Sequence, residues 1–278
     1  MNESYSEVVN IARDYYNSED ADNFYAIIWG GEDIHIGLYN SDNESIVDAS
    51  RRTVEHMLEK VKISPNDRTL DIGSGYCGAA RYLANSRNCH VTAINLSEKE
   101  NQRARDLNKT LNLANKINVI DGSFENIPVD DSSFDLVWSQ DAILHSGHKE
   151  QVFAEVSRAL KPGGKFIFTD PMQADNCPPG VLQPVLERIH LDSLGSFALY
   201  RQLAQKVGLA EVEIEDLTPQ LIMHYTRVQQ ELAKRREELQ GKVSEDYIDR
   251  MLKGLGHWVD AGESGYLSWG IMQFEKTN

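Results

Sequence analysis

Hydrophobic and polar residues follow two different spacings along this chain. From residue 68 onward, short apolar runs recur, and the segments between them place apolar residues three and four positions apart. The short runs are typical of buried strands, and the wider spacing is typical of helices with one apolar face. Strands and helices that alternate in this way predict an α/β fold, with a doubly wound, mostly parallel, Rossmann-like sheet of seven strands. We also expect an N-terminal helical segment and helical lid insertions around this sheet.

The same spacing gives limits for each element. We expect strands at residues 68–72, 90–94, 117–120, 134–138, 165–169, 210–217 and 266–274. We expect helices at residues 47–61, 79–86, 97–113, 149–160, 181–191 and 196–207. The run Lys161-Pro162-Gly163-Gly164 follows one of these helices and predicts a turn before the fifth strand.

The most informative motif is residues 70–78 (LDIGSGYCG), between the first predicted strand and the helix after it. Glycines at such a turn adopt positive φ and let a ligand approach the backbone. Their spacing fits a dinucleotide as well as other nucleosides. Asp71 distinguishes a dinucleotide from other nucleoside ligands. A carboxylate two residues before Gly73 repels a pyrophosphate and suits a ligand with ammonium and sulfonium groups. The motif therefore favours S-adenosyl-L-methionine, held by Asp71, Gly73 and Gly75.

The regular alternation stops after Pro171, where extra segments interrupt the core elements. The predicted organisation is an N-terminal cap and lid segment (1–64), a cofactor-binding α/β core (65–171), a lid insertion (172–196), a core helix and strand (197–218), a helical lid insertion (219–260) and a final core strand (261–278). Open α/β sheets bind ligands at the carboxyl ends of their strands. Because both insertions follow core strands, we expect them to cover that edge as a substrate lid.

Composition limits the partners and the compartment. Lys and Arg number 28 against 43 Asp and Glu, so the formal charge is −15. Such a surface repels nucleic acid and anionic membranes, and we expect neither as a partner. Solubility is the simpler explanation of the acidity, and adaptation to high internal salt or solute is the alternative. The oligomeric state is left open, with a homo-oligomer allowed.

The three cysteines, Cys77, Cys89 and Cys177, lie far apart and show neither metal nor disulfide spacing. This pattern favours a reducing, cytoplasmic compartment and no metal site. The N-terminus has neither the basic start nor the apolar run of a signal peptide, and no stretch approaches the length of a membrane span.

The end of the second predicted strand supplies candidate ribose contacts. Asn95, followed by Leu96, takes the position where methyltransferase sheets usually place an acid on the ribose hydroxyls. Its amide can still bond a diol, accepting from one hydroxyl and donating to the other. An Asx turn at the strand end is the structural alternative. Gln102, one turn into the next helix, is a second candidate for the ribose.

Later strand ends supply further candidates. Ser123 and Phe124 match the polar and apolar sides of an adenine site, although Asp121 offers a carboxylate nearby. Gln140 is placed to contact the methionine moiety. His145 is the candidate catalytic residue beside the transferred methyl group, where it would bind a carboxylate or take a proton from an amine. A histidine that only satisfies a backbone carbonyl is the alternative.

Methyl transfer from a sulfonium needs no covalent protein intermediate, so a shaped pocket is expected rather than a catalytic triad. For an amine acceptor, aromatic faces would stabilise the forming ammonium by cation–π attraction. The aromatic candidates are Tyr25, Trp29, Tyr39, Tyr200, Trp258 and Trp269. Each of them also fits an ordinary core position.

The N-terminal block, residues 15–25 and then 28–39 (IWGGEDIHIGLY), resembles the sarcosine/dimethylglycine N-methyltransferases. The resemblance extends through residues 95–97 (NLS), 139–141 (SQD) and 265–269 (GYLSW), and so covers nearly the whole chain. It implies a class I S-adenosylmethionine-dependent methyltransferase. It also implies methylation of sarcosine to dimethylglycine and then to glycine betaine, a compatible solute.

The resemblance implies residue roles as well. In related enzymes the N-terminal segment folds over the methionine end of the cofactor, which makes Tyr16, His35 and Tyr39 lid candidates. The substrate carries a carboxylate, for which Arg188 and Arg227 in the two insertions are candidates and His145 a third. The candidate substrate contacts are then Tyr25, Trp29, Tyr39, Arg188 and Arg227.

Three alternatives stay open at this point. Within the same fold, the acceptor could be phosphoethanolamine, a phenol or an unsaturated acyl chain, which would require a more basic pocket or a more apolar lid. An NAD-dependent oxidoreductase shares the glycine spacing, but Asp71 argues against it. A protein that binds the cofactor only to act as a regulator is the third.

Overall fold

The computed structural model describes residues 7–189 and 191–277. Residues 1–6, 190 and 278, which belong to the predicted cap, the first lid insertion and the final segment, lie outside the described residues. A seven-stranded sheet forms the centre, in the order β3-β2-β1-β4-β5-β9-β7. Its strands are β1 (Arg68–Ile72), β2 (His90–Asn95), β3 (Ile117–Asp121), β4 (Phe134–Gln140), β5 (Leu160–Thr169), β7 (Leu209–Asp216) and β9 (Gly270–Lys276). β9 runs antiparallel to β5 and β7, and the pairs from β3 to β5 are parallel, which confirms the predicted sheet.

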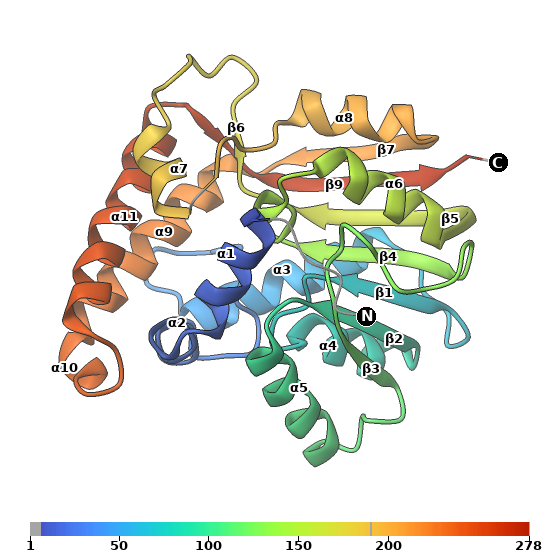
Figure 1. Cartoon of the computed structure of the whole chain (residues 1–278), viewed down its shortest axis with the longest axis horizontal. Helices are drawn as coiled ribbons and strands as arrows, with labels where there is room; N and C mark the ends of the chain where they lie inside the picture. The colour runs from blue at the N-terminus through green and yellow to red at the C-terminus, as the bar shows by residue number, and fades with distance from the viewer. Residues whose placement is uncertain (1–6, 190, 278) are drawn as a thin grey trace.

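Helices cover both faces of this sheet (Figure 1). They are α3 (Ile46–Lys60), α4 (Gly78–Arg87), α5 (Glu98–Thr110), α6 (Lys149–Ala159) and α8 (Phe197–Lys206). On one face, Phe153 of α6 and Tyr200 of α8 pack in a cluster with Phe166 and Phe168 of β5. On the other face, side chains of α3 and α4 form a second cluster around Trp138 of β4. The burial of apolar side chains on both faces explains the near-continuous apolar runs of the central strands.

A third group of helices lies beyond the carboxyl ends of the parallel strands. It consists of α1 (Glu7–Asn17), α2 (Glu19–Phe24), a π-helical turn (Tyr25–Trp29), α7 (Gln183–Ile189), α9 (Thr218–Lys234), α10 (Arg236–Leu239) and α11 (Glu245–Glu263). In Figure 1, α9 and α11 lie side by side along one end of the sheet, with α1 in front of the strand ends. Phe24 and Trp29 share one apolar cluster with Leu232 of α9 and Ile248 of α11. The N-terminal segment and the second insertion therefore form one cap.

The structure corrects two predicted limits. β5 begins at Leu160 rather than after a turn, because Leu160 pairs with Phe134 ahead of a bulge in β4. The predicted final strand is divided at Trp269 into β8 (Leu267–Ser268), which pairs with β6 (Met172–Gln173), and β9. The predicted N-terminal helical segment is confirmed as α1 and α2, whose limits the spacing of apolar residues did not give. Their burial depends on the cap cluster and not on a stripe that faces the sheet.

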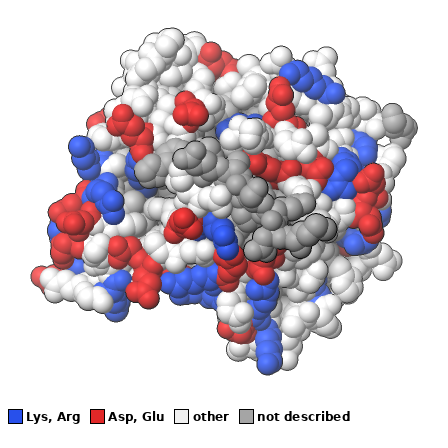
Figure 2. Space-filling view, viewed as in Figure 1, with Lys and Arg blue, Asp and Glu red and all other residues white. Residues whose placement is uncertain are grey.

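Charge is distributed over the surface. Acidic and basic side chains are interspersed on the face seen in Figure 2. Among the residues that the structure describes, no helix is both long enough and apolar enough to cross a membrane.

The segment between the π-helical turn and α3 packs its backbone directly on α3. Leu38 donates its N–H to the Ala49 carbonyl at 3.0 Å. Ser50 Oγ donates to the His35 carbonyl at 2.9 Å. A Cβ at Gly37 would lie 2.7 Å from the Ala49 Cβ and 2.8 Å from the Ser50 nitrogen, closer than real Cβ contacts. Glycine at position 37 therefore allows this segment to reach the edge of the sheet.

Gly37→Ala should lower the free energy of unfolding by about 1–3 kcal/mol, because α3 backbone atoms cannot move aside for the added methyl group. Urea denaturation of the purified protein measures the change. Gly256→Ala is the matched control, since a Cβ there would meet only the Gln229 amide at 3.2 Å. In the interior of α11 this control should be neutral, or stabilising by up to about 1 kcal/mol. Equal stability of the two variants would contradict the close packing of residue 37.

Candidate active site

The loop between β1 and α4 owes its shape to two glycines. The N–H groups of Gly73 and Ser74 donate to the Ile94 carbonyl, at 2.8 and 3.1 Å, and hold the loop against β2. Gly73 has a φ of +75°, and a Cβ there would lie 2.3 Å from the Ala142 Cβ. Gly75 has a φ of +49° and lies against the Ile34 side chain. Larger residues would be strained and would close the space beside the loop.

Asp71 lies at the end of β1, where the loop begins, and its side chain is only 3% exposed. Its Oδ2 atom has no hydrogen-bond partner among the described residues. Burial, and then the neighbouring Asp33 carboxylate, raise the pKa of Asp71 to about 7. A buried carboxylate with an unused oxygen is costly unless a donor or a cation meets it. The loop therefore favours a ligand with a positively charged group.

The glycine loop and the ends of β1, β2 and β4 surround a cavity that we call the loop cavity. The segment 32–35 and residues of α1 complete its wall. Predicted cofactor contacts in this wall are Tyr16, His35, Asp71, Gly73, Gly75, Asn95, Leu96, Phe124 and Gln140. The structure thus brings together most of the residues that were predicted from separate strand ends.

A buried carboxylate that the sequence reading missed joins them. Glu100, in the first turn of α5, lines the loop cavity and is 3% exposed. Its Oε2 accepts a hydrogen bond from Asn95 Nδ2 at 2.8 Å. Burial raises the pKa of Glu100 to about 7. Methyltransferase sheets usually carry an acid at the end of β2; here Glu100, in the first turn of α5, places a carboxylate beside Asn95 instead. The sequence signal that could have identified Glu100 is its position three residues after the N-cap residue Ser97.

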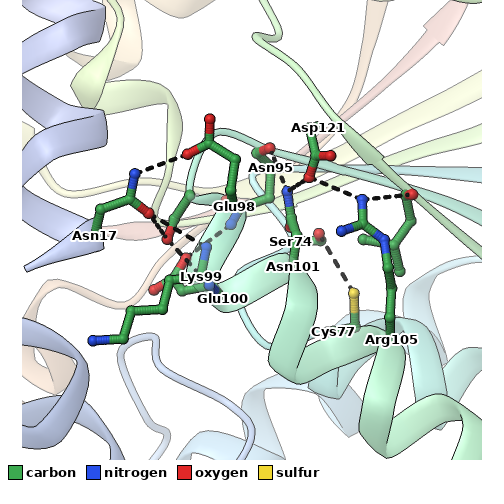
Figure 3. Close-up of polar contacts among 12 residues, drawn as sticks. Asn17, Ser74, Cys77, Asn95, Glu98, Lys99, Glu100, Asn101, Arg105 and Asp121 are labelled. Carbon is green, nitrogen blue, oxygen red and sulfur yellow. Dashed lines mark hydrogen bonds and ion pairs between the residues drawn. The ribbon is translucent and has the colours of Figure 1, made fainter. Parts of the chain in front are cut away.

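Two other predicted cofactor contacts lie outside the loop cavity. Gln102 is on the outer side of α5, where its Nε2 donates to Asp106 at 3.0 Å. Ser123 is buried, and its Oγ accepts from the Glu125 N–H at 3.1 Å. Asp121 is likewise engaged, because Arg105 and Asn101 both donate to its Oδ1 atom (Figure 3). Phe124 is the residue of this loop that reaches the cavity.

A second, larger cavity of about 590 Å³ lies under the cap, and we call it the lid cavity. Side chains of α1, the π-helical turn, α7, α9 and α11 line it. Its aromatic residues are Tyr15, Tyr16, Tyr25, Trp29, Tyr225, Tyr247 and Trp258. Tyr25 and Trp29, two of the predicted substrate contacts, pack with tilted rings whose centroids lie 4.9 Å apart. The aromatic character of these walls suits a cationic amine with methyl groups.

The two cavities meet at a shared wall. The residues that line both are Ala12, Tyr16, Ile34, His35, Asp141 and His145. Tyr16 Oη and His145 Nε2 lie 2.9 Å apart in a hydrogen bond. Burial, with help from Lys149 and Arg188, lowers the pKa of His145 to about 4, so its ring is neutral at pH 7. His145 therefore has an aromatic partner and no added charge at the point where the cavities join.

Arg188 of α7 lines the lid cavity and has no acidic partner among the described residues. Among the described residues no carboxylate forms an ion pair with it, and its Nη2 contacts the Met251 sulfur at 3.4 Å. Its side chain passes over Gly254 of α11, where a Cβ would lie 2.2 Å from the Arg188 Cδ. Gly254 thus leaves the room that Arg188 needs beside α11. An unpaired guanidinium in an aromatic cavity is a ready site for a carboxylate.

Two predicted substrate contacts lie outside the lid cavity. Arg227 pairs with Glu231 at 3.3 Å and with Gln230, on the far side of α9. Tyr39 is buried, and its hydroxyl bonds His224 Nδ1 at 3.0 Å. Of the remaining aromatic candidates, Tyr200 is a core residue bonded to Asp170, and Trp269 donates its indole N–H to Asp141.

Helix α1 is fastened over the loop cavity by its polar side. Asn17 Nδ2 donates to Glu98 at 2.8 Å (Figure 3). Asn17 Oδ1 accepts from Ser97 Oγ at 2.8 Å. Arg13 forms an ion pair with the same Glu98 carboxylate. These contacts connect α1 to the first turn of α5, next to Asn95 and Glu100. A ligand in the loop cavity would thus be covered by α1.

Comparisons with known proteins agree with this geometry. A family model described as a methyltransferase domain matches residues 70–168, which include the glycine loop and strands β1 to β5. The chain is 57% identical, over 97% of both sequences, to a sarcosine/dimethylglycine N-methyltransferase of Halorhodospira halochloris. It is 53% identical to the enzyme of that name from Aphanothece halophytica, over 97% of this chain and 98% of the other.

A solved structure gives the same result for the fold. A protein of Galdieria sulphuraria, proposed to be a sarcosine dimethylglycine methyltransferase, superimposes with a TM-score of 0.91 at 40% identity. The match covers 95% of this chain and 99% of the Galdieria chain, so the cap helices and the core are both included. With a glycine loop led by a buried aspartate and relatives that match from end to end, the chain belongs to the sarcosine/dimethylglycine N-methyltransferases, which are S-adenosyl-L-methionine-dependent class I methyltransferases.

Proposed function

We propose that this protein transfers methyl groups from S-adenosyl-L-methionine to sarcosine and to dimethylglycine, with glycine betaine as the final product. The observation that carries the proposal is the pair of adjoining cavities. One has unused carboxylate oxygens beside a glycine loop, and the other has an unpaired arginine among aromatic rings. A cationic methyl donor suits the first cavity, and an amino acid with a methylated nitrogen suits the second.

The residues of the loop cavity fit the cofactor group by group. Asp71 would face the ammonium group, for which its unpartnered Oδ2 is the acceptor. Gln140 has an unpartnered Nε2, while its Oε1 accepts from the Trp138 indole at 2.9 Å, and that amide would donate to the methionine carboxylate. Glu100, oriented by Asn95, would accept from the ribose hydroxyls. Phe124 would lie against the adenine ring. The bound cofactor supplies an electrophilic methyl group on a positively charged sulfur.

The acceptor would enter the lid cavity. Arg188 is the proposed partner of its carboxylate, and Tyr25 and Trp29 are proposed to face its methylated nitrogen. Arg227 and Tyr39 have no part in this proposal, because their side chains are engaged outside the cavity. The two insertions and the N-terminal segment serve as the lid that keeps water from the junction.

An amine attacks only when its lone pair is free. The cation in the loop cavity and the Arg188 guanidinium both disfavour a protonated amine at the junction, so the pKa of the bound amine falls. Tyr16 would accept the hydrogen bond of the protonated amine and give its own hydroxyl hydrogen to the neutral His145 ring. Because the pKa of His145 is about 4, the ring only relays the proton, which passes on to solvent. A charged His145 would add a further positive charge beside the donor. Its low pKa therefore suits the transfer step.

The direct test of the proposed function is a panel of acceptors with S-adenosyl-L-methionine labelled in its methyl group. We expect label in dimethylglycine when sarcosine is supplied, and in glycine betaine when dimethylglycine is supplied. Phosphoethanolamine and a phenol should stay unlabelled, because neither carries the carboxylate for which Arg188 is the proposed partner. Label in phosphoethanolamine with none in the amino acids would overturn the proposal.

Cofactor affinity should depend on pH through the two buried carboxyl groups. Asp71 and Glu100 have pKa values raised to about 7, so each is largely protonated below pH 6 and ionised above pH 8. The cationic donor binds the ionised form, so its affinity should fall by roughly tenfold for each group as pH drops from 8 to 6. Isothermal titration calorimetry measures the affinity and the proton release. Asp71→Asn should bind weakly at both pH values with a flatter profile, and an unchanged profile would contradict the assignment.

Tyr16→Phe should lower kcat by about 10- to 100-fold, because the hydroxyl that links the amine to His145 is lost. Tyr82→Phe is the matched control, since Tyr82 lies on α4 under the Arg51 guanidinium and lines neither cavity. Steady-state kinetics with dimethylglycine at saturating cofactor separate the two. If the two variants turned over at the same rate, Tyr16 would have no part in the transfer.

A further inference from the structure

Five tyrosines line the lid cavity, and the pattern of their hydroxyl groups is uneven. Tyr15 Oη lies 2.9 Å from Tyr247 Oη and 3.4 Å from Tyr25 Oη. Tyr16 is bonded to His145. Tyr225 is the fifth, and its hydroxyl has no hydrogen-bond partner among the residues that the structure describes. One phenol of this cavity is therefore free to bond a ligand.

The ring of Tyr225 is held firmly on α9. It packs against the Trp258 ring at a centroid distance of 4.9 Å and meets the His224 ring edge-on at 5.7 Å. His224 in turn accepts from the Gly37 N–H at 3.2 Å and from the Tyr39 hydroxyl. These contacts fix the direction of the Tyr225 side chain, which is half-buried in the cavity wall. A fixed donor loses little entropy when it binds a ligand.

Tyr225 and Arg188 contact the same stretch of α11. Arg188 lies over Gly254, and the Tyr225 ring packs on Trp258, one helical turn further on. Burial raises the pKa of the Tyr225 hydroxyl, and the Arg188 guanidinium is the largest influence that lowers it again. Arg188 has no acidic partner, and Tyr225 has no acceptor. Two unpaired donor groups, one charged and one neutral, thus share one part of the cavity. This arrangement suits a planar anion with two oxygens.

We propose that Tyr225 is a specificity-determining residue, whose hydroxyl donates a hydrogen bond to the substrate carboxylate beside Arg188. The inference rests on the proposed function, because it places the carboxylate of a methylated glycine in the lid cavity. Arg188 supplies the charge, and Tyr225 fixes the orientation of the carboxylate. The enzyme thereby selects amino acids over amines of the same shape without a carboxylate.

Tyr225→Phe tests this inference with two acceptors, dimethylglycine and N,N-dimethylethylamine, which lacks the carboxylate. The variant should raise the KM for dimethylglycine by about tenfold with kcat within about twofold, as expected for one lost hydrogen bond to a charged group. Its kcat/KM for the carboxylate-free amine should equal that of the unaltered enzyme. Tyr266→Phe, whose ring lies outside both cavities, is the matched control and should change neither acceptor. Thermal unfolding and S-adenosylhomocysteine affinity of each variant show that fold and cofactor site are intact.

The outcomes separate the two proposals. If the unaltered enzyme methylates dimethylglycine but Tyr225→Phe leaves its KM unchanged, the role of Tyr225 is refuted while the proposed function stands. Equal losses with both acceptors would mean that Tyr225 only shapes the cavity, which also refutes the inference. If the unaltered enzyme does not methylate dimethylglycine at all, the proposed function itself fails.

Discussion

The architecture of the site depends on the close approach of segment 32–37 to the glycine loop. A Cβ at Gly78 would lie 2.2 Å from Asp33 Oδ1, so the segment occupies the space that a side chain would take. Asp141 fastens the same segment from the sheet, because its Oδ2 accepts from the Ile36 N–H at 2.7 Å. Its Oδ1 accepts from the Trp269 indole at 2.8 Å. The half-buried Asp141 carboxylate thus ties the N-terminal segment, the end of β4 and the C-terminal strands together.

This constraint divides the space at the strand ends into two cavities of opposite polarity. The unused polar atoms of the loop cavity include the carboxylate oxygens of Asp33 and Asp71, which suit positive charge. The free groups of the lid cavity include Arg188 and Tyr225, which suit negative charge. A zwitterionic acceptor would place its carboxylate at the far end of the lid cavity, with its nitrogen toward the cation. An acceptor bound in this way would be oriented for transfer before any residue moves, which is a large part of what positioning contributes to such a reaction.

The sequence was sufficient for the parts whose signals are local. The apolar runs predicted the seven strands, and the aspartate before Gly73 predicted the cofactor. Both signals depend only on residues that are neighbours in the sequence. The role of Glu100 was missed, since an acid in the first turn of a helix is also what the helix dipole favours. The N-terminal helical segment was predicted, but the limits of α1 and α2 were not, because these helices pack on the cap rather than on the sheet. Gln102 and Arg227 could not be excluded as ligand contacts from the sequence. Only the folded chain shows that Gln102 is hydrogen-bonded to Asp106 and that Arg227 forms an ion pair with Glu231.

A crystal structure with S-adenosylhomocysteine and dimethylglycine would test the two-cavity account most directly. The account predicts the homocysteine product in the loop cavity, with its ammonium group at Asp71 and its ribose at Glu100. It predicts dimethylglycine in the lid cavity, with the carboxylate at Arg188 and Tyr225 and the nitrogen at the shared wall of Tyr16, Asp141 and His145. Dimethylglycine bound the other way round, with its carboxylate at that shared wall, would contradict it.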